Sequence, residues 1–284
     1  MDTGGPAAPA RRLGRVLRQL RDATGKTQLE VAKFVGTAPT TISKFENGER
    51  IPPPPHLKLM CLLYGVDETR AESLMRLVEQ AKEPGWWSDY GDDVPKWFTA
   101  YVAEENGANE IWVYEQGFIP GLLQTRRYTE AITAAASEAV AETSESAQGF
   151  ARVRATRQQR LRAEPPLALR AVMDESVLHR RVGEPGVMAE QFAHLREAMG
   201  QPNISLRILP FSVGIHPGCT GSFTVLRFIE RSMNMVYVEQ RGGAFYLERP
   251  RDVDLHEEIF EQLWHLALNS EDTASLLVEM EGKG

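Results

Sequence analysis

The sequence predicts a small all-α domain of five helices, followed by a larger domain of mixed α+β (or α/β) type. Up to Ala81 the apolar residues recur at helical spacing, whereas beyond Pro166 short apolar runs of strand length alternate with helical segments. With 284 residues and 42% hydrophobic content, the chain holds more material than the helical domain uses. We therefore divide it into a disordered polar tail at 1–10, a helical domain at 11–83 and a second domain at 84–284.

The first, fourth and fifth helices of the small domain are predicted from apolar residues that repeat every three or four positions. For the first helix these residues are Leu13, Val16, Leu17 and Leu20. For the fourth helix, which ends at Gly65, they are Leu57, Met60 and Leu63. For the fifth helix they are Leu74, Leu77, Val78 and Ala81.

The second and third helices are predicted from residues 27–47, TQLEVAKFVGTAPTTISKFEN. Gln28 opens the second helix, and Ala32 falls where two helices cross closely, because a larger side chain there would push them apart. Gly36 marks the turn between the helices, where only glycine adopts a positive φ without steric cost.

Pro39 suits the first turn of the third helix, since its missing N–H would have no partner within the helix there. Ile42 and Phe45 lie three residues apart, so both point back into the core. The polar side chains of the third helix face outward: Thr40, Thr41, Ser43 and Lys44. Two short helices crossing steeply leave the third helix free to enter a DNA major groove.

The stretch from about residue 11 to residue 82 resembles the lambda repressor/Cro-like helix-turn-helix of the XRE class. The residues that carry the resemblance are Gln28, Ala32, Gly36, Ile42, Ser43, Phe45, Glu46, Asn47 and Gly48. The resemblance implies a DNA-binding transcriptional regulator. We predict base contacts from Pro39, Thr40, Thr41 and Lys44. We predict phosphate contacts from Gln28, Ser43, Asn47 and Arg50.

The chain departs from the family pattern at Pro39, because many members carry glutamine there. Proline cannot make a bidentate contact with adenine. Direct base readout should therefore depend on Thr40, Thr41 and Lys44, with an apolar contact from Pro39 to a thymine methyl. The alternative interpretation, a helical bundle without DNA binding, leaves the match at several coupled positions unexplained.

The charge distribution agrees with a nucleic-acid partner for the first domain only. The whole chain has a formal net charge of −7. Residues 11–60 hold ten Lys and Arg against four Asp and Glu, whereas residues 85–284 hold nineteen against twenty-nine. The charge of residues 11–60 therefore favours binding to DNA phosphates, and that of residues 85–284 does not.

Several classes of protein are disfavoured by the sequence. The tail MDTGGPAAPA has no apolar core of a signal peptide, and no window approaches a membrane span. Cys61 and Cys219 form neither a metal-ligand spacing nor a disulfide framework. We expect a cytoplasmic protein without membrane contact, metal or cofactor.

The second domain opens with an aromatic-rich region, which holds ten of the 23 aromatic residues between Trp86 and Tyr128. We predict a helix over 95–104, a strand over 111–114 and a helix over 127–136. Residues 137–149 are predicted as a loop or a frayed helix start. A strongly basic helix follows, with Arg152, Arg154, Arg157, Arg160 and Arg162. Such a helix touches DNA or, more commonly, forms a solvated face.

The remainder mixes both kinds of secondary structure. LALRAVMD and ISLRILP predict strands, and ESVLHRRV and PGVMAEQFAHLREAMG predict helices. Three further strands are predicted from SFTVLRF, MVYVEQ and AFYLE, after the Gly/Pro-rich loop FSVGIHPGCTG. Two helices, at 252–268 and 271–281, close the chain.

This part also shows a resemblance. The segments EQGFIPGLLQTRRYTEAI, RQQRL, VMDESVLHRRVG, ILPFSVGIHPGCTGSFTVLRF and VYVEQ resemble the C-terminal domain of unknown function found behind this helix-turn-helix in many actinobacterial regulators. The resemblance implies a regulator often paired with a small protein encoded nearby, in an antitoxin-like or developmental role. It does not supply a ligand or catalytic residues.

Five residues of the second domain have side chains that could be either catalytic or structural. Asp174, Glu175 and His179 place two carboxylates and an imidazole close along the chain, and His216 with Cys219 offers a thiol and an imidazole. Acidic residues at a helix start complement its dipole, and residues of Gly/Pro-rich loops are commonly structural. We therefore expect no enzyme, with a cryptic active site in the second domain as a lesser alternative.

A role in sensing or partner binding is favoured for the second domain. The candidate contacts with a ligand or partner are Trp86, Trp87, Tyr90, Trp112 and His216. The prediction is a homodimeric regulator whose affinity for a double-stranded operator is modulated by a small-molecule effector or a small protein partner. The alternative is an antitoxin-like protein–protein interaction module with secondary DNA binding.

Overall fold

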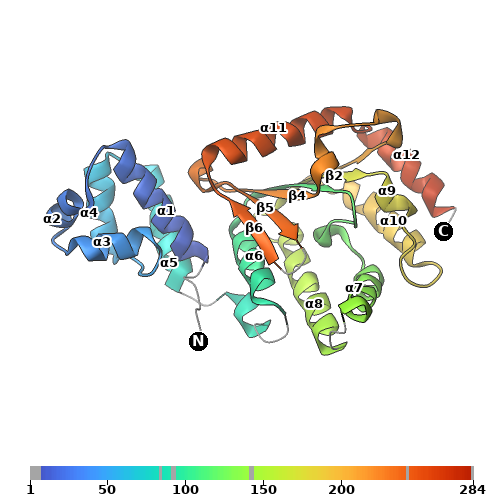
Figure 1. The fold of residues 1–284 in the computed structure, drawn as a ribbon, viewed down its shortest axis with the longest axis horizontal. Coiled ribbons are helices and arrows are strands. Elements are labelled where there is room, and N and C mark those ends of the chain that lie inside the picture. The colour runs from blue at the N-terminus through green and yellow to red at the C-terminus, as the bar shows by residue number, and fades with distance from the viewer. Residues whose placement is uncertain (1–7, 83–84, 91–93, 141–143, 241–242, 283–284) are drawn as a thin grey trace. The chain divides into compact units, whose positions relative to one another are not determined.

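The computed structural model describes residues 8–82, 85–90, 94–140, 144–240 and 243–282 (Figure 1). The chain divides into two compact units. The first comprises Met1–Ser88 with Glu230–Met233, and the second comprises Asp89–Ile229 with Asn234–Gly284. The division after Ser88 falls slightly later than the boundary at 83–84 that the sequence suggested.

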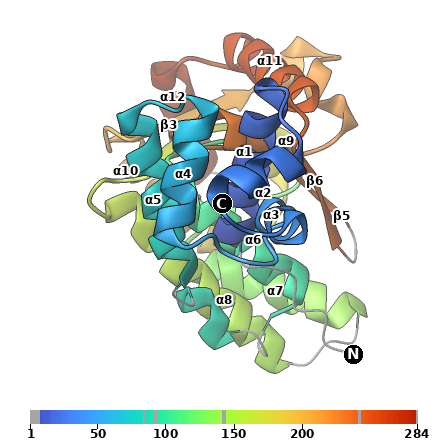
Figure 2. The same ribbon diagram turned by 90° about the vertical axis from the view of Figure 1, so that its left-hand side faces the viewer.

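The first unit contains the five helices predicted for it. They are α1 (Ala8–Ala23), α2 (Gln28–Val35), α3 (Pro39–Glu46), α4 (Pro54–Tyr64) and α5 (Glu68–Lys82). Figure 2 shows the same helices after a quarter turn about the vertical axis. Residues 8–10, which we had assigned to the tail, form the first turn of α1, because Ala8, Pro9 and Ala10 fit a helix start and are buried. Residues 1–7 lie outside the described part.

Apolar side chains from all five helices form the core of this unit. The fully buried members include Leu13, Val16, Leu17, Val31, Ile42, Phe45, Leu57, Met60, Leu74 and Val78. Nearly all of these positions follow the three-to-four residue spacing that predicts a helix with one buried face. Leu20, Leu63 and Leu77, which we expected on the same faces, are only partly buried.

The second unit is built on one sheet with helices around it. Its strands are β1 (Glu110–Glu115), β2 (Ala168–Asp174), β3 (Ile204–Leu209), β4 (Phe223–Arg227), β5 (Met235–Gln240) and β6 (Gly243–Leu247). Its helices are α6 (Lys96–Gly107), α7 (Arg126–Val140), α8 (Ser144–Gln158), α9 (Ser176–His179), α10 (Val187–Met199), α11 (Pro250–Leu266) and α12 (Ser270–Glu281). The mixed fold class predicted for this domain is confirmed.

The sheet has the strand order β3-β2-β1-β4-β5-β6. β1, β2 and β3 run parallel, and helices form the crossovers between them, as parallel strands require. β4, β5 and β6 continue the sheet from β1 in antiparallel fashion through short connections. One half of the sheet is therefore of α/β type and the other half of α+β type.

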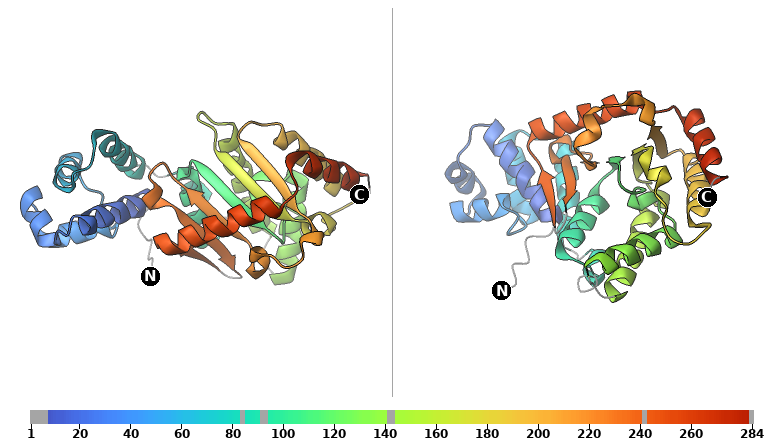
Figure 3. Two further views of the ribbon diagram at one scale, coloured as in Figure 1. Left: turned by 90° about the horizontal axis from the view of Figure 1, so that it is seen from above. Right: turned by 45° about the vertical axis from the view of Figure 1, so that its right-hand side comes forward.

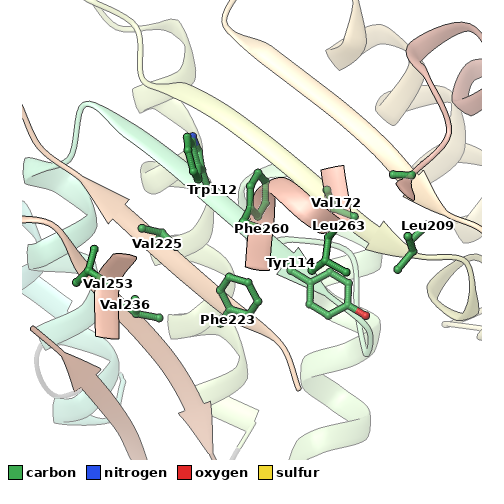
Figure 4. Close-up of a cluster of buried hydrophobic side chains, with 11 residues drawn as sticks. Trp112, Tyr114, Val172, Leu209, Phe223, Val225, Val236, Val253, Phe260 and Leu263 are labelled. Carbon is green, nitrogen blue, oxygen red and sulfur yellow. The ribbon is translucent and has the colours of Figure 1, made fainter. Parts of the chain in front are cut away.

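One face of the sheet is covered by α11, which lies across the strands in Figure 3. Figure 4 shows the cluster buried between them. The sheet contributes Trp112, Tyr114, Val172, Leu209, Phe223, Val225 and Val236, and α11 contributes Val253, Phe260 and Leu263. Trp112 and Tyr114 are two residues apart on β1, so they share this face.

The other face is covered by α6 and α8. Tyr101 of α6 packs against Tyr237 of β5, with ring centroids 4.1 Å apart. Arg157 of α8 donates from Nε and Nη2 to the two carboxylate oxygens of Glu105 on α6, both at 2.6 Å. Burial alone would lower the pKa of Arg157, but the charge and hydrogen bonds of Glu105 raise it above its ordinary value.

One prediction for this region was wrong, and another had left two alternatives open. The basic helix is not a solvated face: Arg157 is buried against Glu105, Arg154 donates to Gln124, and Arg160 donates to the carbonyl of Ala108 at 3.0 Å. A long arginine can reach an internal acceptor from a half-buried helix, and sequence spacing does not show this. The segment 137–149 is largely helical, since α7 extends to Val140 and α8 begins at Ser144; residues 141–143 lie outside the described residues.

Candidate functional site

Local capping sets the geometry of the helix-turn-helix. Thr27 and Glu30 form a reciprocal capping box at the start of α2, in which Thr27 N donates to Glu30 Oε2 at 2.8 Å and Glu30 N to Thr27 Oγ1 at 3.2 Å. α2 ends at Gly36, whose φ of 78° lies in the left-handed region that side chains rarely adopt. The positive φ predicted at this turn is confirmed, and α3 then begins at Pro39.

α3 has two distinct faces. Ile42, Phe45 and Glu46 are buried, whereas Pro39, Thr40 and Lys44 are exposed. Thr41 and Ser43 are half-buried at the border between the faces. The outward orientation predicted for Thr40 and Lys44 is confirmed, so a run of polar side chains is presented along one short helix.

A buried polar network holds the C-terminal end of α3. Arg21 of α1 donates to both carboxylate oxygens of Glu46, from Nε at 2.6 Å and from Nη2 at 3.1 Å. Gln28 of α2 donates to Glu46 Oε2 at 2.8 Å. The hydrogen bond to Glu46 raises the pKa of Arg21 above its ordinary value. The Glu46 carboxylate thus connects α1, α2 and α3. Arg18 is a second cation near it, with Nε 3.8 Å from Glu46 Oε2.

The α1 helix approaches the end of α3 at Gly14. A Cβ atom added there would lie 2.5 Å from the carbonyl oxygen of Phe45 and 2.7 Å from that of Glu46. Any side chain at this position would push α1 away from α3. Sequence reasoning missed both Gly14 and the role of Glu46, although the family motif contained Glu46 and one helical turn separates Arg18 from Arg21.

The predicted phosphate contacts lie at the two ends of the helix pair. Gln28 is half-buried at the start of α2, and its amide already donates to Glu46. Asn47 and Arg50 are exposed just after α3, and Asn47 donates to Glu49 Oε1 at 3.3 Å. Gln28 has a second amide hydrogen, so an internal bond and a phosphate contact are compatible.

The aromatic candidates have different surroundings. Trp86 and Trp87 form an edge-to-face pair, with ring centroids 5.9 Å apart, in the 3₁₀ segment Trp86–Tyr90, and both are half-buried, as is Tyr90. Trp112 is buried against Phe260 at 5.1 Å and has the guanidinium of Arg227 over its ring at 4.1 Å. This packing makes Trp112 a core residue.

The remaining candidate, His216, lies where the parallel strands end. Its side chain is nearly buried, and its Nε2 is 3.8 Å from Asp174 Oδ2 at the end of β2. Its ring meets that of Tyr114, from β1, edge to face with centroids 6.0 Å apart. Neither His216 Nδ1 nor the Tyr114 hydroxyl, both buried, has a hydrogen-bond partner among the described residues.

Among the catalytic candidates from the sequence, the carboxylates form hydrogen bonds with nearby backbone groups. Asp174 Oδ1 accepts from Ser176 N at 2.9 Å, and Glu175 Oε2 accepts from Phe211 N at 2.8 Å. Such bonds to backbone N–H groups are what carboxylates at helix starts and loops commonly make. Cys219 is exposed, and its backbone N–H donates to the carbonyl of His216 at 3.1 Å.

Among the described residues, His, Cys, Asp and Glu side chains do not gather in groups of three or more that could hold a metal ion. Nor does any helix in the described ranges have both the length and the apolar character needed to cross a membrane.

Comparison with known families divides the chain in the same way as the structure. Residues 12–74 match the model of a helix-turn-helix domain, which covers α1 to α4 and part of α5. This match supports a DNA-binding regulator. No curated protein matches the chain. Residues 98–279, well over half of the chain and nearly all of the second unit, match the domain of unknown function DUF5753, so the chain belongs to the DUF5753 family.

Proposed function

We propose that this protein is a sequence-specific transcriptional regulator of the XRE class that acts in the cytoplasm of an actinobacterium. The observation that supports this best is the two-faced α3 helix. Pro39, Thr40 and Lys44 are exposed, while the opposite face is fixed by Ile42, Phe45 and the Glu46 network. A helix held this rigidly can present its polar side chains to base edges with little loss of conformational freedom.

The chemistry of the exposed side chains suggests their partners. Lys44 suits guanine O6 and N7, and the hydroxyls of Thr40 and Thr41 suit either donors or acceptors on base edges. Pro39 offers apolar contact to a thymine methyl. The amides of Gln28 and Asn47, the hydroxyl of Ser43 and the guanidinium of Arg50 suit phosphates, which position the protein without reading sequence.

We further propose a homodimer. The α3 helix has only eight residues, and one such helix contacts too few base pairs for useful specificity. Two-fold pairing would place two copies on half-sites one helical turn apart, which predicts a pseudo-palindromic operator.

The second unit is proposed as the regulatory part, without catalysis of its own. A small molecule or a small protein partner bound there would change operator affinity only by favouring one of two states of the dimer. If a small protein co-purifies with the chain and DNA binding is weak without any effector, the antitoxin-like interaction module becomes the better description.

The test begins with selection of duplexes from a randomised library by the full-length protein. Binding to the selected duplex is then measured by fluorescence anisotropy over a salt series. The variants are Thr40→Ala with Lys44→Ala, and Arg76→Ala as the control, because Arg76 is an exposed cation on α5 of the same unit. Both variants lose one positive charge.

We expect the wild type to select a two-fold related sequence. The double variant should lose at least about tenfold in affinity, and its salt slope should fall by about 1. Arg76→Ala should change neither quantity appreciably. Selection of no sequence, or equal losses in both variants, would contradict α3 as the element that reads DNA.

A further inference from the structure

The carboxyl ends of β1, β2 and β3 meet at one edge of the sheet, because these three strands are parallel. Residues 210–222 return the chain along this edge before β4, which runs the opposite way. Hydrogen bonds join the loops: Ser176 Oγ donates to the carbonyl of Gln116 at 3.2 Å, and Gln116 N donates to Ser222 Oγ at 3.1 Å. Crevices beyond the carboxyl ends of parallel strands are the usual ligand sites of such sheets.

Two polar groups at this edge are buried without a protein partner. The Tyr114 side chain is 0% exposed, and its hydroxyl forms no hydrogen bond within the described ranges. The His216 side chain is 8% exposed, and Nδ1 likewise has no partner among the residues described. Buried polar atoms of native proteins are nearly always satisfied. Because these two atoms belong to adjoining rings at the carboxyl ends of parallel strands, this edge is a candidate ligand site.

The neighbouring charges indicate what kind of ligand fits. A carboxylate only accepts hydrogen bonds, so Asp174 Oδ2 at 3.8 Å favours the tautomer of His216 that carries its proton on Nε2, and in that tautomer Nδ1 is an acceptor. Burial, followed by the charge of Asp174, raises the pKa of Tyr114 above its ordinary value, so the phenol stays neutral. The charged neighbours that act on this hydroxyl are acidic, which suits a cation that donates hydrogen bonds.

The rim of the same edge is apolar. Ile215 is 96% exposed, and Phe118 and Phe211 are each 55% exposed. Phe211 stacks on the ring of His179 at 5.5 Å, which fixes it beside the end of α9. Single exposed apolar residues are common, but three on the loops of one edge can contact the apolar group of a ligand.

We propose that this edge binds a small primary amine that carries an apolar group. The ammonium group donates to His216 Nδ1 and the Tyr114 hydroxyl, while the Asp174 carboxylate lies on the Nε2 side of the imidazole, and the apolar group lies on Phe211 and Ile215. Because Tyr114 is enclosed, the loop 210–222 moves outward to admit the ligand. The regulatory meaning of this site rests on the proposed function; its existence as a site does not.

The experiment uses the full-length protein and calorimetric titration with two probes, phenethylamine and isobutylamine. Phenethyl alcohol and 3-phenylpropanoate are the matched uncharged and anionic controls. Tyr114→Phe removes only the hydroxyl, and Tyr237→Phe is the control variant, since Tyr237 is a buried tyrosine on the other face whose hydroxyl donates to Glu239 at 3.3 Å. Thermal unfolding of both variants checks their fold.

At least one amine should bind the wild type, and 3-phenylpropanoate should bind at least about tenfold more weakly. Tyr114→Phe should weaken amine binding about tenfold, the effect of one hydrogen bond to a charged group, without lowering stability. Tyr237→Phe should leave amine binding unchanged. No binding by either amine at millimolar concentration, equal binding of the anion, or no effect of Tyr114→Phe would overturn the proposal.

A second measurement separates the site from its regulatory role. Operator affinity is compared with and without the bound amine, for the wild type and for Tyr114→Phe. If the amine binds through Tyr114 but operator affinity does not change, the site stands and the modulation by small molecules fails. If operator binding is absent while the amine still binds, the failure belongs to the proposed function alone.

Discussion

Each unit of this protein contains an arginine that donates two hydrogen bonds to a buried glutamate. In the first unit Arg21 binds Glu46, and in the second Arg157 binds Glu105. The first pair lies behind the exposed face of α3 and also involves Gln28, a predicted phosphate contact. The second pair is enclosed by aromatic rings, with the Arg157 guanidinium 5.1 Å from the Tyr101 ring centroid and 5.4 Å from that of Phe98.

The difference shows that similar ion pairs can serve different ends. A pair that is fully enclosed acts on the stability of the packed unit, since neither charge can regain water if the other is lost. A pair that lies one layer behind a binding surface also orients that surface. Changes to the two pairs should therefore differ both in the size of the stability loss and in whether DNA binding responds.

The largest effect is expected from Arg157→Met. It leaves the Glu105 carboxylate buried, with Tyr101 as its remaining hydrogen-bond donor in the described structure. We expect the free energy of unfolding of the second unit to fall by about 3 to 5 kcal/mol, measured by urea denaturation of the full chain. Arg162→Met, at an exposed arginine just beyond α8, is the control. A further change of Glu105→Leu in the Arg157→Met background should recover part of the loss, and equal losses in Arg157→Met and the control would refute the explanation.

A smaller stability loss with a larger functional effect is expected from Glu46→Gln. The amide keeps the shape of the side chain but removes the charge that Arg21 binds, which should cost about 1 to 3 kcal/mol. Operator affinity should fall because the end of α3 is less firmly held. The salt slope should stay unchanged, since no positive charge at the DNA-facing surface is lost, in contrast with Lys44→Ala. Glu72→Gln on α5, exposed and remote from α3, is the control; a reduced salt slope in Glu46→Gln would instead indicate a lost phosphate contact.

The second unit also contains a carboxyl group whose pKa is set mainly by burial. Burial raises the pKa of Glu115 to about 7, and a hydrogen bond from Ser222 only partly opposes this. Since the folded pKa lies above the unfolded value, the folded state loses stability as pH rises from about 4.5 to 7. Glu115→Gln should therefore stabilise the protein at pH 8 by about 1 to 2 kcal/mol, and the gain should vanish near pH 5. Thermal unfolding at both pH values tests this, with exposed Glu130→Gln as the control; a gain that does not depend on pH would rule out titration of Glu115.

The comparison also explains how much of the fold the sequence predicts. Several helix starts and ends in the first unit were predictable because their causes are local: Gly36, Pro39 and Gly65 act within a few residues. The strands of the second unit were predictable for the same reason. Their order β3-β2-β1-β4-β5-β6 was not, because strand pairing depends on contacts between residues far apart in the sequence.

In the candidate sites, too, features with local causes could be predicted from the sequence, whereas features that need contacts between distant residues could not. The outward face of α3 follows from helical periodicity alone, so Thr40 and Lys44 could be identified. The pairs Arg21–Glu46 and Arg157–Glu105 span 25 and 52 residues, and no local pattern joins their members. Asp174 and His216 were both noticed in the sequence, but with other partners, because only the fold brings the end of β2 beside the loop before β4.

The smallest loss of stability is expected from Gly36→Ala, which changes only the backbone preference at the turn between α2 and α3. A Cβ at Gly36 would meet no atom within 4 Å, so Gly36→Ala tests the backbone conformation alone. A φ of 78° should cost alanine about 1 kcal/mol, and Gly36→Asn should cost less, since asparagine tolerates the left-handed region. Urea denaturation gives the free energy of unfolding, and operator affinity should be nearly unchanged, because the turn is strained without loss of the Glu46 network. A large loss of affinity in both variants would mean that the turn itself, rather than the buried network behind α3, sets the orientation of the DNA-reading helix.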